Sequence, residues 1–270
     1  MTANNTHRVG NYCEFMTELP DYVVKNREYW DGQADQWVEM GERAWTEDPN
    51  WGIWGIPESE LDLLPDDMSG MDAIELGCGT AYVSAWMARR GARCVGIDNS
   101  ARQLDTARRL AGEHGLELEL IHGNAETLPY PDGSFDFAVS EYGAAIWADP
   151  YKWIPEAWRV LKPGAGLSFL GHHPLVMVTQ QREEGDEVTR ELLYPYFGLH
   201  RVDWFEDDGA GTEFNLPISE WMRLFDEVGF EVVAFHEIRS PSREAEKRFF
   251  VPADWAHDFP SEQAWRLHKR

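Results

Sequence analysis

Short apolar segments that read as strands alternate with helical segments from about residue 71 to residue 171, and this alternation constrains the fold more than any other feature of the chain. Ala73–Leu76 reads as the first strand and Cys94–Ile97 as the second, with a helix-spaced apolar stripe between them. Such alternation predicts a parallel sheet with helices on both faces. We therefore expect a doubly wound α/β fold that binds ligands beyond the carboxyl ends of its strands.

Further strands follow, and one long insertion interrupts the alternation. Residues from 172 to about 217 break the pattern, and within them a hairpin is expected around the turn at 207–211. Residues 1–70 are acidic and rich in tryptophan, and they read as an irregular helical cap. We predict an N-terminal cap over 1–70 and a main domain over 71–270, with a lid insertion at about 172–217. The remaining expected strands are Leu116–Leu120, Phe135–Val139, Leu167–Leu170, Phe230–Ile238 and Ala264–His268.

Charge and cysteine content exclude several classes of protein. The 270 residues carry 24 basic and 48 acidic side chains, a formal net charge of −24, which disfavours nucleic acid as a partner. Cys13, Cys78 and Cys94 form no C-x-x-C pair, so a reduced environment is expected rather than a disulfide scaffold or a thiolate zinc site. The first residues resemble no signal peptide, and no apolar run reaches the roughly 18 residues of a membrane span. We expect a soluble cytoplasmic protein without a membrane partner.

A glycine-rich turn follows the first strand and identifies the ligand class. The turn is Glu75-Leu76-Gly77-Cys78-Gly79-Thr80, and an acidic residue, Asp98, ends the second strand about 20 residues later, as nucleotide-binding βαβ units require. A dinucleotide site would need a third glycine where Tyr82 stands. The loop carries an acid, Glu75, and no Arg or Lys. An amine and a positive sulfonium suit this loop better than a diphosphate, so we expect an adenosyl cofactor without phosphates.

Four ordered motifs resemble those of class I S-adenosylmethionine-dependent methyltransferases, in particular their small-molecule branch. The motifs are residues 75–80, Asp98, residues 123–129 and residues 159–164. The resemblance is strong over about residues 71–171 and weaker over the last two strands. It implies a Rossmann-like sheet of seven strands, mostly parallel with the last strand antiparallel, and S-adenosyl-L-methionine as cofactor.

The resemblance also implies roles for individual residues. Asp98 would hold the ribose hydroxyls, with Asn99 beside the adenosine. The sequence departs from the family pattern at Asn124, where Asp is commoner, and at Ala81, where many members have glycine. The methionine part would be flanked by Glu75, Gly77, Cys78, Gly79 and Thr80, and the adenine edge would be met by Asn124, Ala125 and Glu126.

Two further segments are candidates for the methyl-donor end of the cofactor. Ser140 and Glu141 follow the fourth strand, and Glu141 could bind the methionine amine or remain a solvated loop acid. The aromatic residues of the cap, Trp30 foremost, could pack on the cationic cofactor or simply cover the edge of the sheet.

The candidate catalytic residues are His172, His173 and Tyr142. Either histidine could take a proton from an attacking hydroxyl or amine, because imidazoles titrate near neutral pH, or could be structural. Consecutive residues that leave a strand point opposite ways, so at most one should face the substrate. We favour His173 slightly because Pro174 restricts its backbone. No residue spacing fixes a metal site, so none is expected.

The sequence thus predicts an enzyme that transfers a methyl group from S-adenosylmethionine to an oxygen, nitrogen or carbon of a small organic acceptor. Two alternatives stay open. One is a non-catalytic S-adenosylmethionine-binding regulatory protein of the same fold, and the other is a nicotinamide-dependent oxidoreductase, which Tyr82 disfavours. The acceptor and the oligomeric state are not determined by the sequence.

Overall fold

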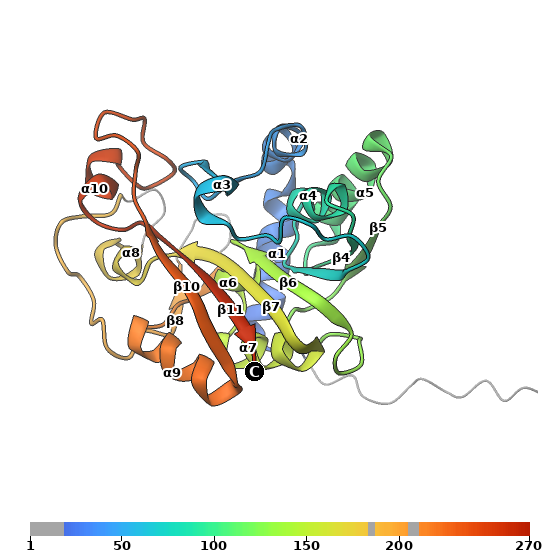
Figure 1. Cartoon of the computed structure of the whole chain (residues 1–270). Coiled ribbons are helices and arrows are strands. Elements are labelled where there is room, and N and C mark those ends of the chain that lie inside the picture. The colour runs from blue at the N-terminus through green and yellow to red at the C-terminus, as the bar shows by residue number, and fades with distance from the viewer. Residues whose placement is uncertain (1–18, 183–186, 205–210) are drawn as a thin grey trace, which may run out of the picture.

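The structure is a computed structural model that describes residues 19–182, 187–204 and 211–270 (Figure 1). The expectations about Cys13, about the first residues of the chain and about most of the turn at 207–211 fall outside the described residues. Within the described ranges no helix is long and apolar enough to cross a membrane.

A seven-stranded sheet forms the centre of the fold, in the spatial order β10-β11-β7-β6-β3-β4-β5. The pairs from β7 to β5 are parallel, whereas β11 is antiparallel to both β7 and β10. The expected mostly parallel sheet with an antiparallel last strand is therefore confirmed. The strands are β3 (Asp72–Leu76), β4 (Arg93–Asp98), β5 (Leu118–His122), β6 (Phe135–Glu141), β7 (Leu161–His172), β10 (Phe230–Ile238) and β11 (Glu262–Lys269).

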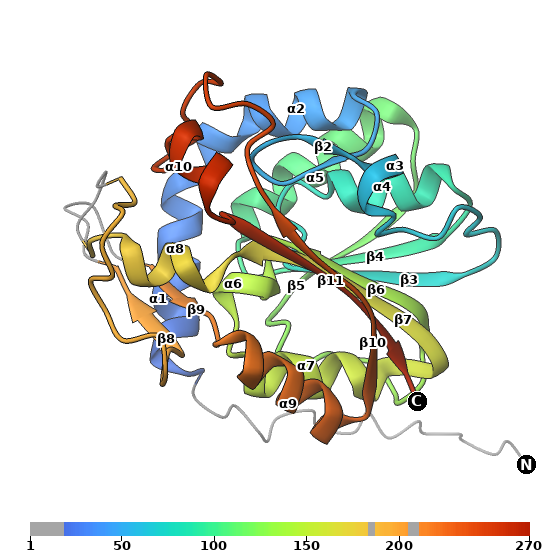
Figure 2. The same ribbon diagram turned by 60° about the vertical axis from the view of Figure 1, so that its left-hand side comes forward.

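Helices cover both faces of this sheet (Figure 2). The helices α4 (Tyr82–Arg89) and α5 (Ala101–His114) lie on one face, and α7 (Pro150–Val160) and α9 (Ile218–Val228) lie on the other. The α5 helix begins as expected, because the Ser100 side chain accepts a hydrogen bond from the backbone of Gln103 at 3.2 Å. On the α7–α9 side, fully buried aromatic side chains fill the core, including Trp153, Trp221, Phe225, Phe169 and Trp265.

Most of the other elements gather beyond the carboxyl ends of the parallel strands, whereas the helices within residues 38–61 pack on the outer side of α4 (Figure 2). From the N-terminal part come α1 (Asp21–Gln33), the 3-10 helix η1 (Ala34–Trp37), α2 (Val38–Thr46), the short pair β1 (Asn50–Trp51) and β2 (Ile56–Pro57), and α3 (Glu58–Leu61). From later in the chain come α6 (Ala144–Trp147), α8 (Pro174–Thr179), the antiparallel pair β8 (Arg201–Asp203) and β9 (Thr212–Phe214), and α10 (Ala253–Asp258).

Three expected boundaries were wrong. The helical spacing of Ile154, Ala157, Trp158 and Leu161 predicts a helix up to Pro163-Gly164. The helix instead ends at Val160, because Leu161 is buried opposite Phe135 and already begins β7. The third strand begins at Leu118 rather than Leu116, since Leu116 is still bonded back to the end of α5. Ser59 is the expected cap of a short helix through Leu61 and Leu64. It does not cap α3, which begins at Glu58 after Pro57.

Candidate functional site

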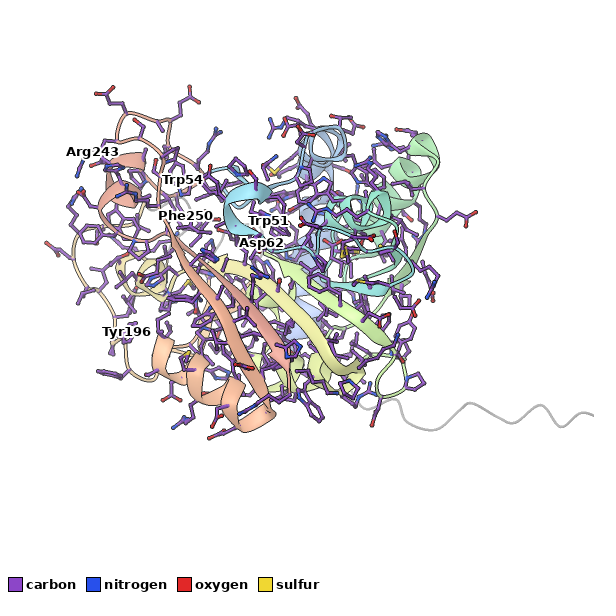
Figure 3. All side chains as sticks on the ribbon, in the orientation of Figure 1. Trp51, Trp54, Asp62, Tyr196, Arg243 and Phe250 are labelled. Carbon is purple, nitrogen blue, oxygen red and sulfur yellow. The ribbon has the colours of Figure 1, made fainter. Side chains whose placement is uncertain are left out.

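A cavity of about 1280 Å³ lies at the carboxyl ends of the central strands. One side is lined by the loops after β3, β4 and β5, and the other by residues after β6 and β7 and by residues of β9. Trp54 from the N-terminal part and Phe250 from the C-terminal part close over it and pack against one apolar cluster (Figure 3). The cavity therefore occupies the place where a doubly wound sheet binds its ligand.

The glycine turn after β3 approaches other backbone closely on one side and leaves open space on the other. Gly77 has a φ of +75°, and a Cβ on it would lie 2.6 Å from the backbone nitrogen of Ala144 and from Cα of Gly143. Gly79 has a φ of +50°, and a Cβ on it would meet nothing within 4 Å. Ala81, the departure from the family's usual glycine, has a φ of +61°, the left-handed conformation that glycine adopts without strain.

Asp98 is held in place at the end of β4 by two backbone amides. Its Oδ2 accepts a hydrogen bond from the Gly79 N–H and its Oδ1 from the Ser100 N–H, each at 2.7 Å. Burial raises the pKa of this carboxyl above its ordinary value. Each oxygen retains a further lone pair, so a diol of the ligand could still donate to both.

Two further acids line the same half of the cavity. Glu75 Oε2 accepts hydrogen bonds from the backbone N–H and the hydroxyl of Ser84, and burial raises the pKa of Glu75 to about 8. Glu141 accepts from the Gly52 N–H at 2.7 Å and from the Tyr82 hydroxyl at 2.5 Å, and burial raises its pKa to about 7. No cation of the described residues forms an ion pair with either acid, so a cationic ligand would find two carboxyls ready to ionise beside it.

The residues expected near the adenine are divided between the cavity and its surroundings. Asn124 and Ala125 line the cavity, as does Asn99, whose amide also donates to the Val23 carbonyl and so fixes α1. Glu126 lies outside, because its carboxylate accepts hydrogen bonds from the Tyr22 hydroxyl and the Asp149 N–H.

Ser140, Cys78 and Thr80 complete the cofactor candidates. Ser140 is fully buried and does not line the cavity, since its hydroxyl donates to the Leu76 carbonyl and accepts from the Ala145 N–H. Cys78 and Thr80 line the cavity together with the rest of the glycine turn.

Aromatic rings form the wall that faces the glycine turn. Trp30, the sequence candidate, contacts Trp147 and Trp37 edge to face, with centroids 5.2 and 5.4 Å apart. Trp37 in turn stacks on Phe249 at 5.9 Å, which joins the N-terminal cap to the segment before α10. All four rings line the cavity.

The structure separates the two consecutive histidines. His172 lines the cavity, whereas His173 does not. His173 is the N-cap of α8, and its Nδ1 accepts from the Leu175 N–H at 3.2 Å, while burial lowers its pKa to about 4. The preference for His173 is therefore corrected: Pro174 fixes the start of a helix and makes His173 its cap.

Tyr142 lines the cavity beside His172, with ring centroids 5.0 Å apart. Its hydroxyl donates to Glu262 Oε1 at 2.7 Å, and burial raises the pKa of the phenol well above its ordinary value. Tyr142 is thus poorly suited to accept a proton at neutral pH.

Two buried acids beside the cavity were not among the candidates predicted from the sequence. Glu213 on β9 lies with its Oε2 3.2 Å from His172 Nδ1 and lines the cavity. Glu262 on β11 accepts from the Ile53 N–H and from Tyr142, and burial raises its pKa to about 7. The only signal for Glu213 was an acid within a short apolar strand, and nothing in the sequence indicated that this strand would meet the end of β7.

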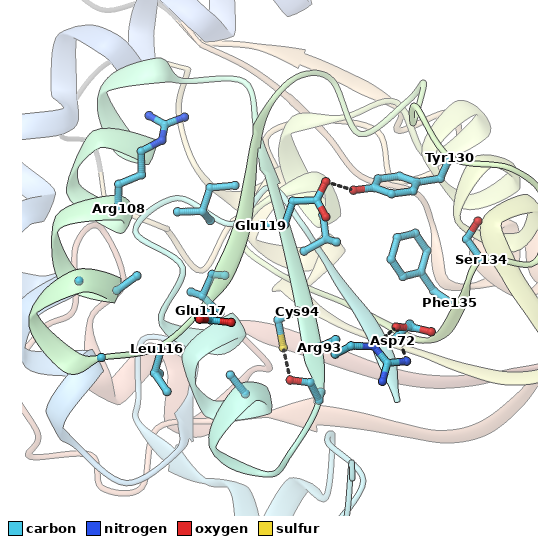
Figure 4. A pocket seen from close by; sticks show the side chains of 18 residues that line it. Asp72, Arg93, Cys94, Arg108, Leu116, Glu117, Glu119, Tyr130, Ser134 and Phe135 are labelled. Carbon is cyan, nitrogen blue, oxygen red and sulfur yellow. Dashed lines mark hydrogen bonds and ion pairs between the residues drawn. The ribbon is translucent and has the colours of Figure 1, made fainter. Parts of the chain in front are cut away.

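A second pocket, of about 960 Å³, lies at the opposite end of the strands (Figure 4). Its polar walls are already paired, since Arg93 bonds Asp72 and the Tyr130 hydroxyl donates to Glu119. Over the described ranges, no three His, Cys, Asp or Glu side chains are grouped so as to hold a metal ion.

The residues in the larger cavity fit S-adenosylmethionine. The open side of the glycine turn would admit the ligand, and the oriented Asp98 carboxylate suits the ribose diol. The two high-pKa acids, Glu75 and Glu141, suit an amine and a sulfonium, whereas their negative charge on ionisation would repel a diphosphate.

Comparisons with known proteins agree with this chemistry. A family model described as "Methyltransferase domain" matches residues 74–169. A 2-methyl-6-phytyl-1,4-hydroquinone methyltransferase from Oryza sativa is 34% identical over 59% of this chain and 48% of its own length. A demethylmenaquinone methyltransferase from Bacillus velezensis is 30% identical over 62% of this chain and 74% of its own length. The match spans about half the length of the rice protein and of a Thermus thermophilus relative.

Among solved structures, an S-adenosylmethionine dependent methyltransferase from Mesorhizobium loti superposes with a TM-score of 0.63 at 20% identity. The superposition covers 81% of this chain and all of the other. This likeness concerns the fold.

Proposed function

The chain belongs to the class I S-adenosylmethionine-dependent methyltransferases, and from this premise we propose that it is an enzyme that methylates a small organic acceptor. The proposal rests on one part of the cavity, which suits an adenosyl ligand without phosphates. This part holds the oriented Asp98 carboxylate, the open space at Gly79 and the acid Glu75. When bound there, S-adenosylmethionine supplies an activated methyl group on a positive sulfur.

The chain's own residues would bind and orient. Asp98 would accept the ribose hydroxyls, and Glu75 and Glu141 would ionise beside the cationic end of the ligand. The aromatic wall around Trp30 would exclude water and favour the positive charge. Because the leaving group needs no further activation, positioning would supply most of the catalysis.

The N-terminal cap and the insertion at about 172–217 would close the cavity. Two buried carboxyls anchor the loop after β1: Glu141 accepts from the Gly52 N–H and Glu262 from the Ile53 N–H. The insertion contributes His172 and Glu213 to the opposite wall. We propose that this loop and the insertion act as the lid over the reacting groups.

For the acceptor we propose a hydroxylated aromatic ring. The relatives named above act, by their names, on a hydroquinone and on demethylmenaquinone. In this chain further flat side chains line the same cavity, among them Tyr142, Trp204 and Phe250. Flat rings favour stacking with an aromatic acceptor over an elongated aliphatic one.

The test is a screen with methyl-labelled S-adenosylmethionine against phenols, hydroquinones, amines and thiols. Label transfer to a phenol or hydroquinone that is lost in Asp98→Ala supports the proposal. S-adenosylmethionine binding without transfer to any acceptor class would instead favour the non-catalytic alternative.

A further inference from the structure

His172 and Glu213 form a buried pair in the wall of the cavity. His172 ends β7 and Glu213 lies on β9, and the Nδ1–Oε2 distance is 3.2 Å. Each side chain is 8% exposed, and both line the cavity. Across residues 19–182, 187–204 and 211–270, no hydrogen bond reaches His172 Nε2. Nε2 is thus the ring nitrogen left for a ligand.

The pairing determines which nitrogen carries the hydrogen. An ionised carboxylate only accepts hydrogen bonds, so Nδ1 must donate to Glu213 and Nε2 keeps its lone pair. Neighbours hold the pair rigidly: the Asn215 amide donates to the His172 carbonyl at 2.8 Å, and the Gln263 amide donates to it at 3.1 Å. The ring of Phe250 lies against the imidazole, with centroids 5.4 Å apart.

The charged and titratable groups around the pair come from every adjoining element. Glu262 on β11 stands opposite His172 in the strand register, and Tyr142 after β6 donates its hydroxyl to Glu262. Arg182, after α8, lies over the Trp204 ring, and its positive charge acts on Glu213. The imidazole thus lies among two acids and a phenol.

We propose that His172 Nε2 removes the proton from a phenolic hydroxyl of the acceptor, and that Glu213 is the positioning residue that orients the imidazole. This inference rests on the proposed function. The hydroxyl proton moves to Nε2, and the oxygen electron pair, directly or through the ring, forms the bond to the methyl carbon while the C–S bond breaks and its electron pair stays on sulfur. If the bond forms at a ring carbon, the proton of that carbon moves to the oxygen. The imidazolium then gives its proton to water.

Acceptor acidity argues for a phenol. Phenols ionise with a pKa of about 10, as tyrosine does, within reach of an imidazole base. Water and aliphatic alcohols are far weaker acids, so their ionisation by an imidazole before attack is much less favourable. An imidazole base and the surrounding aromatic rings therefore both favour a phenol as acceptor.

The chain contains its own matched control. His173 Nε2 lies 3.2 Å from Glu237 Oε1, the same spacing as in the His172–Glu213 pair, yet neither residue lines the cavity. His172→Asn and Glu213→Gln are therefore compared with His173→Asn and Glu237→Gln. Asparagine retains a good helix cap at position 173.

The first readout needs no methyl donor. Para-nitrophenol is titrated into each protein, with S-adenosylhomocysteine present, at a pH below the pKa of the phenol, and the absorbance of bound nitrophenolate is recorded. The wild type and both control variants should bind the probe as nitrophenolate, and His172→Asn should lose at least tenfold of that signal. Equal nitrophenolate in His172→Asn, or none in the wild type, overturns the proposal.

The second readout is turnover against phenols of graded acidity. His172→Asn should slow transfer to weakly acidic phenols by about 10²–10⁴-fold, and the deficit should shrink for phenols already ionised. Glu213→Gln should lower turnover at least tenfold and displace the acidic limb of the pH–rate profile, with partial rescue by Glu213→Asp. If His172→Asn slows transfer to all phenols by the same factor, His172 has a structural role and is not the general base. Transfer to phenols at wild-type rates in His172→Asn refutes this inference alone, whereas phenols inert in the wild type refute the acceptor class.

Discussion

Replacing Gly77 by alanine should destabilise the fold, whereas the same change at Gly79 should chiefly impair ligand binding. Both glycines have positive φ, so each alanine incurs about 1–2 kcal/mol of left-handed backbone strain. At Gly77 the new Cβ would also lie 2.6 Å from backbone atoms of residues 143 and 144, which cannot swing aside, and such overpacking adds about 1–3 kcal/mol. The free energy of unfolding should therefore fall by about 2–5 kcal/mol in Gly77→Ala.

At Gly79 the space is open, and only the backbone term applies. The added methyl group stands at the cavity wall, where it should weaken S-adenosylhomocysteine binding at least tenfold, or about 1.4 kcal/mol. Denaturant unfolding and calorimetric titration of both variants measure the two effects separately. If Gly77→Ala has the same free energy of unfolding as Gly79→Ala, the close approach of Gly77 to Gly143 is refuted. If Gly79→Ala binds S-adenosylhomocysteine with unchanged affinity, Gly79 does not lie beside the ligand.

Three further predictions follow from the buried acids. Asp98→Ala should weaken S-adenosylhomocysteine binding by about 1.5–3 kcal/mol, and Asp98→Asn less; unchanged affinity with an intact fold excludes Asp98 from the ribose site. Burial raises the pKa values of Glu75, Glu141 and Glu262 above the unfolded value of 4.5. Their contribution to stability is therefore complete below pH 4.5 and is lost as the pH rises through about 7 to 8. The melting temperature of the ligand-free protein should fall from about pH 5 to about pH 8. Glu262→Gln should flatten that fall, and a melting curve that rises over this range contradicts the assignment. Cofactor binding at pH 7 should release protons, because Glu75 ionises beside the positive charge of the ligand. The measured binding enthalpy should then vary with the ionisation enthalpy of the buffer. The same binding enthalpy in all buffers would show that Glu75 does not contact the cation.

The cofactor half of the cavity could be predicted from the sequence because its parts are local. The glycine turn and Asp98 belong to one strand–helix–strand unit, so their spacing alone brings them together. Even here one neighbour was misplaced, since Glu126 is bonded by Tyr22 of α1, a contact that no local pattern reveals.

The acceptor half depends on contacts between distant parts of the chain. His172 and Glu213 are 41 residues apart and meet only because the β8–β9 hairpin lies against the end of β7. His173 was favoured because Pro174 restricts its backbone, but that proline begins α8 and the histidine caps the helix. The end of α7 was placed too late for a similar reason, since pairing of Leu161 with β6 overrides the helical spacing of Ile154 and Ala157.

Calorimetric titration of the wild-type protein with S-adenosylmethionine tests the central claim most directly. The claim is that the cavity at the carboxyl ends of β3 and β4 binds a phosphate-free adenosyl cofactor. We expect binding at micromolar affinity or tighter, equivalent to about −8 kcal/mol or better, with displacement by S-adenosylhomocysteine. No heat and no displacement at millimolar cofactor would contradict it.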